Sequence, residues 1–127
     1  GCFSEDYSLR TVEDMDCWLK ILHERNDITY IDEKLGYYWI GDNISTDIST
    51  MQYSENLYKK YMPLVEPKMQ FWVKRTLYYS NAIRFQRAGF FKEATYSYLK
   101  SLPMFTIQYN LKACFLFFYC CFKSILK

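Results

Sequence analysis

The sequence lacks an apolar run long enough to cross a lipid bilayer. Its longest uninterrupted apolar stretch, residues 113–122, has ten residues, whereas a membrane-spanning helix needs roughly 20. The chain also lacks an initiator methionine and a signal peptide, because it opens directly on Gly1-Cys2-Phe3. We therefore expect a piece of a longer protein, located in the cytoplasm either free or peripherally on the inner face of the membrane.

The sequence has neither the cysteine spacing of a zinc site nor that of a disulfide framework. The five cysteines are an odd number, two of them are adjacent, and no C-x-x-C motif occurs. The single histidine, His23, has no cysteine or aspartate at ligand spacing. These absences predict free thiols in a reducing compartment and no metal site in this chain.

Acidic residues are missing from the end of the chain, where Glu93 is the last one. Residues 1–47 carry eleven acidic and four basic side chains, a net charge of −7, whereas residues 48–127 carry three acidic and twelve basic ones, a net charge of +9. Half of the residues are apolar and a fifth are aromatic, which excludes an intrinsically disordered chain. This division predicts an acidic polar site early in the chain and a basic surface late.

The first part of the chain, residues 1–49, has a mixed helix and strand pattern. The spacing Thr11-x-x-Asp14 is typical of a capping box, with Thr11 as the N-cap of a helix that runs to about Arg25. Residues 28–31 and 35–40 predict two short strands, which would be edge elements of a larger sheet in the parent protein. The helix prediction rests on apolar residues at three- and four-residue spacing: Val12, Met15, Trp18, Leu19 and Leu22.

The second part, residues 50–127, is predicted to be a helical tail. Its helices are expected at residues 51–62, 68–88, 91–102 and 106–126, and Gly89 is expected as a C-cap. Small residues on both sides of Gly89, at Ala82 and Ala94, match one tetratricopeptide-like helix pair. A solenoid needs about three repeats, so we favour a plain hairpin within an α+β, predominantly α-helical fold.

Four short motifs follow one another in residues 1–47. In this order and spacing they resemble the C-terminal part of the catalytic domain of family 2 glycosyltransferases, which have the GT-A fold. The family pattern runs G-x-F-D-E, E-D-x-D-x-W-L-R, Y-I-D-E-x-L-x-Y-Y-R and H-x-x-N-x-S. The matching segments are Gly1-Cys2-Phe3-Ser4-Glu5, Glu13-Asp14-Met15-Asp16-Cys17-Trp18-Leu19-Lys20, Tyr30-Ile31-Asp32-Glu33-Lys34-Leu35-Gly36-Tyr37-Tyr38 and Asn43-x-Ser45.

The resemblance implies an inverting transferase that moves a sugar from a nucleotide-sugar to a saccharide or lipid-linked acceptor, in surface polysaccharide assembly. It implies that Asp14 is the general base for the acceptor hydroxyl, that Glu13 helps to orient the acceptor, and that Trp18, Tyr38 and Trp39 bind it. A divalent metal, Mg or Mn, and the nucleotide would be held by an Asp-x-Asp motif upstream of residue 1. The chain alone is therefore expected to hold no cofactor and to be inactive.

Ordinary helix chemistry explains part of the same pattern. Acidic residues in a first helical turn are favoured by capping and by the helix dipole alone. Trp18 also belongs to the apolar stripe, and Asp16 points to a different helix face, so we expect Asp16 to be structural. The sequence departs from the family where Ser4, Trp39 and Gly41 stand in place of Asp, Arg and His, on the diphosphate side of the site.

The last helix, expected within residues 106–127, is aromatic and basic and leaves three interpretations open. It can lie on a membrane surface with its lysines at anionic headgroups, dock on the hairpin, or bury against a second copy of the chain. An alternative function for the whole chain is a non-catalytic helical interaction or oligomerisation module that uses residues 68–127. No nucleic-acid-binding motif occurs, so nucleic acid is not expected as a partner.

Overall fold

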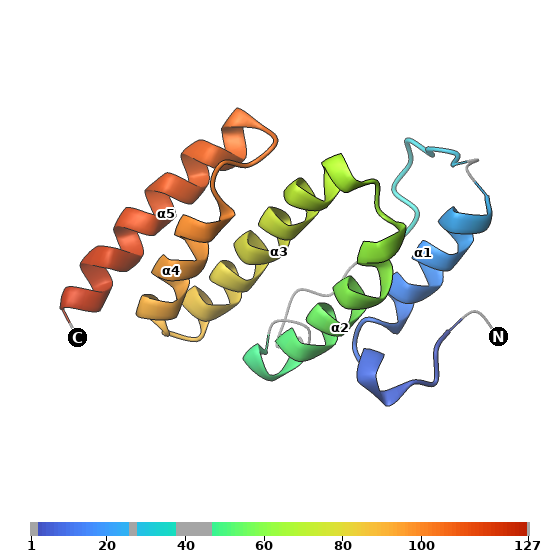
Figure 1. The fold of residues 1–127 in the computed structure, drawn as a ribbon, viewed down its shortest axis with the longest axis horizontal. Coiled ribbons are helices and arrows are strands. Elements are labelled where there is room, and N and C mark those ends of the chain that lie inside the picture. Colours follow the sequence, from blue (N-terminus) through green and yellow to red (C-terminus); the bar gives the residue numbers. More distant parts are fainter. Residues whose placement is uncertain (1–2, 26–27, 38–46, 127) are drawn as a thin grey trace.

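The structure of the chain is a computed structural model, which describes residues 3–25, 28–37 and 47–126. Over these ranges it is all-α, so the predicted α+β class is wrong. Figure 1 shows the α-helices side by side in chain order, with α1 and α5 at opposite ends of the row. In the described ranges, three short 3-10 helices accompany them: η1 (Tyr7–Leu9), η3 (Ile48–Thr50) and η4 (Met62–Leu64). The α-helices are α1 (Glu13–Glu24), α2 (Met51–Tyr61), α3 (Pro67–Arg87), α4 (Phe91–Ser101) and α5 (Ile107–Ile125).

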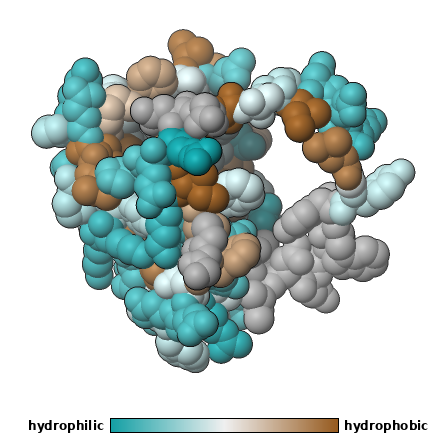
Figure 2. Space-filling model, turned by 90° about the vertical axis from the view of Figure 1, so that its right-hand side faces the viewer, coloured by the Kyte–Doolittle hydropathy of each residue, from teal (hydrophilic) through white to brown (hydrophobic). Residues whose placement is uncertain are grey.

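The two predicted strands are not formed where the structure describes them. Residues 28–37 contain no strand and are all exposed, and residues 38–40 lie outside the described ranges. The physical reason is that a strand needs a neighbour to pair with its backbone N–H and C=O groups, and the described part of the chain offers none. Residues 28–37 form an arm near α1 (Figure 1, cyan). Figure 2 shows that this end of the molecule carries a segment that extends away from the helices and bears apolar side chains.

The predicted capping box at the start of α1 is also wrong. The N-cap is Val12, and no side chain caps the helix. Thr11 has φ 69°, which is outside the extended region that an N-cap residue normally adopts. A turn closed by the Val12 N–H donating to the Leu9 carbonyl, at 3.0 Å, imposes this conformation. The Asp14 carboxylate accepts from the N–H of Met15 instead, at 2.7 Å.

The predicted helices of the tail are confirmed to within one or two residues, and α3 and α4 form the expected hairpin. Gly89 has φ 81° and closes α3 in a Schellman motif. The Phe90 N–H donates to the Phe85 carbonyl at 2.9 Å and the Gly89 N–H to the Gln86 carbonyl at 3.1 Å. Glycine suits this position because it has no Cβ to clash in the left-handed region.

The hydrophobic core lies among α3, α4 and α5. Ala82 and Ala94, the small residues predicted to let α3 and α4 approach, are completely buried, and so is Tyr98. The Tyr98 hydroxyl donates to the Gln86 side chain at 2.6 Å, which satisfies a polar group that burial would otherwise leave without a partner. The other buried members are Tyr79, Met104, Ala113 and Cys120.

A single row of helices leaves much surface uncovered. The chain has an accessible surface of 10027 Å². A compact monomer of 15.4 kDa would expose about 7,200 Å², so this chain exposes about 40% more. Large hydrophobic side chains are exposed along α1, the arm and α5.

The four cysteines among the described residues divide into two groups, and Cys2 lies outside those residues. Cys114, Cys120 and Cys121 are free, as predicted, and burial, reinforced by Cys121, raises the pKa of the Cys120 thiol. The prediction is wrong for Cys17, which is disulfide-bonded, because a bridge set by tertiary proximity leaves no trace in cysteine spacing. Among the described helices, none is both long and apolar enough to traverse a bilayer.

Candidate functional site

The two candidate catalytic carboxylates open α1. Asp14 is exposed and Glu13 is half-buried. The Glu13 Oε2 atom is buried and has no hydrogen-bond partner among the described residues. Both side chains sit at the N-terminus of α1, where the partial positive charge of the helix dipole favours negative groups. The exposed Asp14 carboxylate therefore lies beside a buried Glu13 oxygen that has no hydrogen-bond partner among the described residues.

Trp18 lies one helical turn after Asp14, on the same face of α1. Its side chain is 63% exposed, so the indole ring is at the surface and not in the core. Such a ring offers a flat apolar surface next to the Asp14 carboxylate. The other two candidate acceptor-binding residues, Tyr38 and Trp39, lie outside the described residues, so the structure does not place them.

Asp16 is the acidic residue of this motif that the structure buries completely. Its Oδ1 atom accepts from Lys60 Nζ at 2.6 Å and from the Tyr61 hydroxyl at 2.8 Å. Its Oδ2 atom lies 2.7 Å from Lys20 Nζ. The expectation that Asp16 is structural is confirmed, since it ties α1 to the end of α2.

The surroundings of Asp16 change two pKa values in opposite directions. Burial acts to raise the pKa of Asp16, but the hydrogen bonds from Lys20, Lys60 and Tyr61 outweigh it and lower the value to about 2. Burial and the hydrogen bond to Asp16 raise the pKa of Tyr61 to about 12. Asp16 therefore stays ionised, with a protonated tyrosine as its donor.

A second set of contacts fixes the approach to α1. The Asn56 side chain on α2 donates to the carbonyl of Ser8 in η1 at 3.0 Å. The rings of Tyr7 and Tyr53 meet edge to face, with their centroids 6.5 Å apart. Together with the Asp16 cluster, these contacts hold the start of α1 on α2 from two sides, which fixes the position of Glu13 and Asp14.

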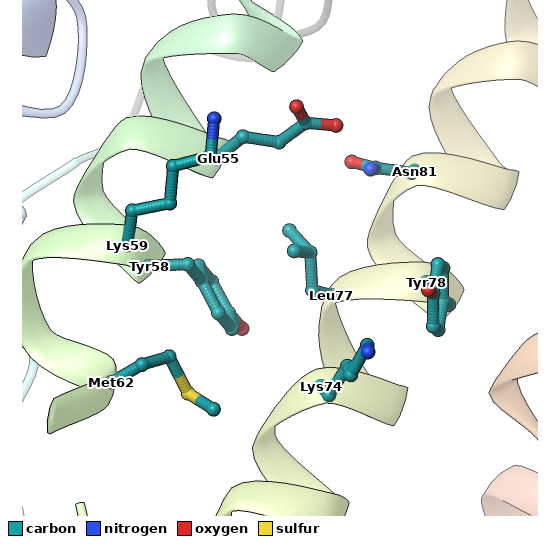
Figure 3. A pocket seen from close by; sticks show the side chains of 8 residues that line it. All are labelled: Glu55, Tyr58, Lys59, Met62, Lys74, Leu77, Tyr78 and Asn81. Carbon is teal, nitrogen blue, oxygen red and sulfur yellow. The ribbon is translucent and has the colours of Figure 1, made fainter.

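The pocket between α2 and α3 was not anticipated from the sequence. It has a volume of about 380 Å³, within the range of small-molecule sites. Figure 3 shows Glu55 and Asn81 reaching toward each other from the two helices. Asn81 is 6% exposed and its Oδ1 atom has no partner among the described residues. The remaining lining residues are Tyr58, Lys59, Met62, Lys74, Leu77 and Tyr78.

The signal that could have revealed this pocket is a mixed stripe on each helix. The lining positions recur at three- and four-residue spacing on both α2 and α3, and each stripe mixes charged or amide groups with aromatic and aliphatic ones. A stripe of this kind fits a groove better than a core. Burial raises the pKa of Tyr58 in the same groove, and the positive charge of Arg84 offsets only part of this rise.

A neighbouring groove between α3 and α4 gathers cations. The Arg75 guanidinium stacks 4.2 Å from the Phe71 ring centroid and donates to the Lys100 carbonyl at 2.9 Å. Lys74, Arg75 and Lys100 all line this groove, and Lys74 also lines the pocket between α2 and α3. This groove forms part of the basic late surface that the sequence predicts, and it suits an anionic group.

Asp14 is not among the lining residues of these two grooves. Within the described ranges, no group of three or more histidine, cysteine, aspartate or glutamate side chains is arranged to hold a metal ion. Asp14 and Trp18 are exposed on α1, Glu13 is half-buried beside them, and Asp16 ties this helix to α2. Comparison with family models, with curated proteins and with solved structures finds no match to this chain.

Proposed function

We propose that this chain supplies the acceptor-side wall of an inverting nucleotide-sugar glycosyltransferase, with Asp14 as the general base. The observation that carries the proposal is the division of labour in Glu13-Asp14-Met15-Asp16. Asp14 is exposed at the start of α1, whereas Asp16 is buried and anchors that helix. This division occurs within the four motifs that resemble family 2 glycosyltransferases.

The chemistry of the exposed carboxylate fits the proposed role. An inverting transferase needs a base that removes the proton of the acceptor hydroxyl as its oxygen attacks the anomeric carbon. Asp14 can accept that proton, because its side chain is exposed at the start of α1. Trp18 offers its ring for the apolar face of a sugar. The Oε2 atom of Glu13 is buried, so the proposal leaves the orientation of the acceptor to Asp14 and Trp18, which shortens the search for a reactive geometry.

Uncovered apolar surface around α1 supports a role for this chain as one part of a larger site. Met15 and Leu22 belong to the apolar stripe of α1, and both are exposed. The arm of residues 28–37 is exposed as well. In the proposal, a further part of the enzyme covers this surface, pairs with the arm, and carries the nucleotide-sugar and its divalent metal.

The test is sugar transfer by an enzyme that contains this chain, with Asp14→Asn as the variant. Loss of a general base lowers turnover by about a hundredfold to ten-thousandfold. We expect a loss of this size with an unchanged melting temperature, because Asp14 is exposed. Glu24→Gln at the other end of α1 is the matched control and should retain transfer. Retained turnover in Asp14→Asn would place the base elsewhere and reject the proposal.

A non-catalytic interaction module remains the second candidate function. The observation that favours it is the exposed apolar side of α5, which none of the contacts proposed for Asp14 would use. The two proposals differ in where they expect damage from substitution. An interaction module would lose function through changes in α5 and keep it in Asp14→Asn, whereas the transferase would show the reverse pattern.

A further inference from the structure

Helix α5 has two apolar faces, and only one of them is covered. Ala113 and Cys120 are completely buried against the hairpin, and Leu116 and Phe117 pack against the same core. This packing accounts for the inner side of α5. Docking on the hairpin, which the sequence leaves open, therefore explains one face of the helix and not the other.

The outer face is a continuous apolar stripe. Successive members are four, four, three, four and three residues apart, which places them on one side of a helix. The stripe spans about 27 Å along the helix axis. Its six side chains are between 62% and 82% exposed: Ile107, Leu111, Phe115, Phe118, Phe122 and Ile125.

We propose that this outer stripe of α5 binds the surface of an anionic lipid bilayer. An interfacial helix places its bulky apolar side chains at the boundary between headgroups and acyl chains, and keeps cationic side chains beside them. Lys112 and Lys123 are both exposed and lie on one flank of the stripe. In this arrangement α5 lies along the surface, with its stripe toward the acyl chains.

The charges of α5 favour a bilayer over a second copy of the chain. Helices that pair through such a stripe commonly use opposite charges on its flanks to set partner and register. No acidic residue follows Glu93, so two copies joined through α5 would bring lysines together without carboxylates on that helix to pair with them. An anionic bilayer supplies a phosphate for each lysine.

The position of α5 leaves the other end of the molecule free. Figure 1 shows α5 at one end of the row and α1 at the opposite end. Binding through α5 therefore does not cover Asp14 or Trp18. The inference is independent of the transferase proposal, because it would hold for any protein that carries this row of helices.

The experiment is flotation of the full chain with vesicles of phosphatidylcholine, either pure or with about 30% phosphatidylglycerol. We expect binding to the anionic vesicles only, and release as salt is raised. Lys112→Gln with Lys123→Gln should weaken that binding about thirtyfold. Exposed lysines elsewhere provide the matched control, and Lys59→Gln with Lys68→Gln should change it little.

A second variant tests the stripe itself. Phe115→Ser, Phe118→Ser and Phe122→Ser together should weaken binding by more than about a hundredfold, with helical circular dichroism retained because all three are exposed. Phe3→Ser, Leu35→Ser and Leu64→Ser remove the same number of exposed apolar side chains elsewhere and should have little effect. Absence of binding to anionic vesicles would overturn the proposal. So would a lipid-free dimer in sedimentation that the triple phenylalanine variant abolishes.

Discussion

At the scale of single residues, the informative contrast is between two aspartates that lie two positions apart. Asp14 contacts the N–H of its neighbour and is otherwise exposed, while Asp16 is buried with three donors. Helix periodicity already separates the two in the sequence, because residues two positions apart point to different faces of a helix. Their different surroundings come from the helix, which turns one toward solvent and the other toward α2.

The first prediction concerns the stability contribution of Asp16. Asp16→Asn removes the charge that Lys20 and Lys60 share, and leaves a neutral amide at a buried ionic contact. The free energy of unfolding should fall by about 2–3 kcal/mol in urea titrations. Asp14→Asn is the same chemical change at an exposed position and should stay within about 0.5 kcal/mol. Equal effects of the two variants would show that Asp16 does not anchor α1.

The second prediction is a pH dependence that comes from Asp16. Its pKa is about 2 in the folded chain, against an ordinary value of 3.8, so the unfolded chain takes up its proton first as pH falls. The stability that Asp16 contributes is full above about pH 5 and is lost as pH falls through about 2. Urea titrations at about pH 6 and about pH 3 should show this loss. In Asp16→Asn, that part of the pH dependence should vanish.

At the scale of elements, the helices could be predicted and the strands could not. Helices 51–62, 68–88, 91–102 and 106–126 follow from spacing and from stop signals such as Gly89, both of which are local. A strand depends on a pairing partner, so residues 28–31 show strand propensity in an arm that the described residues leave unpaired. The capping box failed because the turn before α1 sets the backbone of Thr11.

In the candidate site, too, features that depend on local sequence could be predicted, and features that depend on tertiary contacts could not. The exposed start of α1 follows from the motif, and so does the structural role of Asp16. The groove between α2 and α3 requires knowing which faces of two helices meet, and Cys17 requires knowing what lies near it in space. Neither fact is encoded in spacing along the chain.

The third prediction tests the packing of the hairpin. Ala94 is completely buried where α4 packs on α3, so Ala94→Leu should overpack this contact and lower the free energy of unfolding by about 1–3 kcal/mol. Ala88→Leu adds the same atoms at an exposed position after α3 and should have little effect. Thermal and urea unfolding of the two variants measure the difference. A tolerated Ala94→Leu would mean that α3 and α4 do not approach closely.

At the scale of the whole molecule, the main feature is the amount of surface left uncovered. The accessible surface is about 40% larger than that of a compact monomer of this mass. Apolar side chains are exposed at both ends of the row of helices. Surface of this kind marks contacts with other molecules or other parts of the same protein. The two proposals assign it separately: the α1 end and the arm to the rest of a transferase, and the α5 end to a lipid surface.

The fourth prediction concerns the arm of residues 28–37. Exposed segments without secondary structure are the preferred sites of limited proteolysis. Trypsin should therefore cut the isolated chain first after Lys34, which is exposed in the arm. In the complete enzyme, pairing of the arm should protect this bond. Equal rates of cleavage at Lys34 in the two forms would show that nothing covers the arm.

The most direct measurement of the central claim is the turnover number of Asp14→Asn beside that of Asp16→Asn, in the complete enzyme and at a temperature where both are folded. A general base and a structural anchor should differ in this comparison, because the first affects turnover and the second affects stability. We predict that Asp14→Asn loses transfer by about a hundredfold or more at full stability, and that Asp16→Asn keeps most of its turnover at reduced stability. If Asp14→Asn turns over normally, the carboxylate at the start of α1 does not take the acceptor proton.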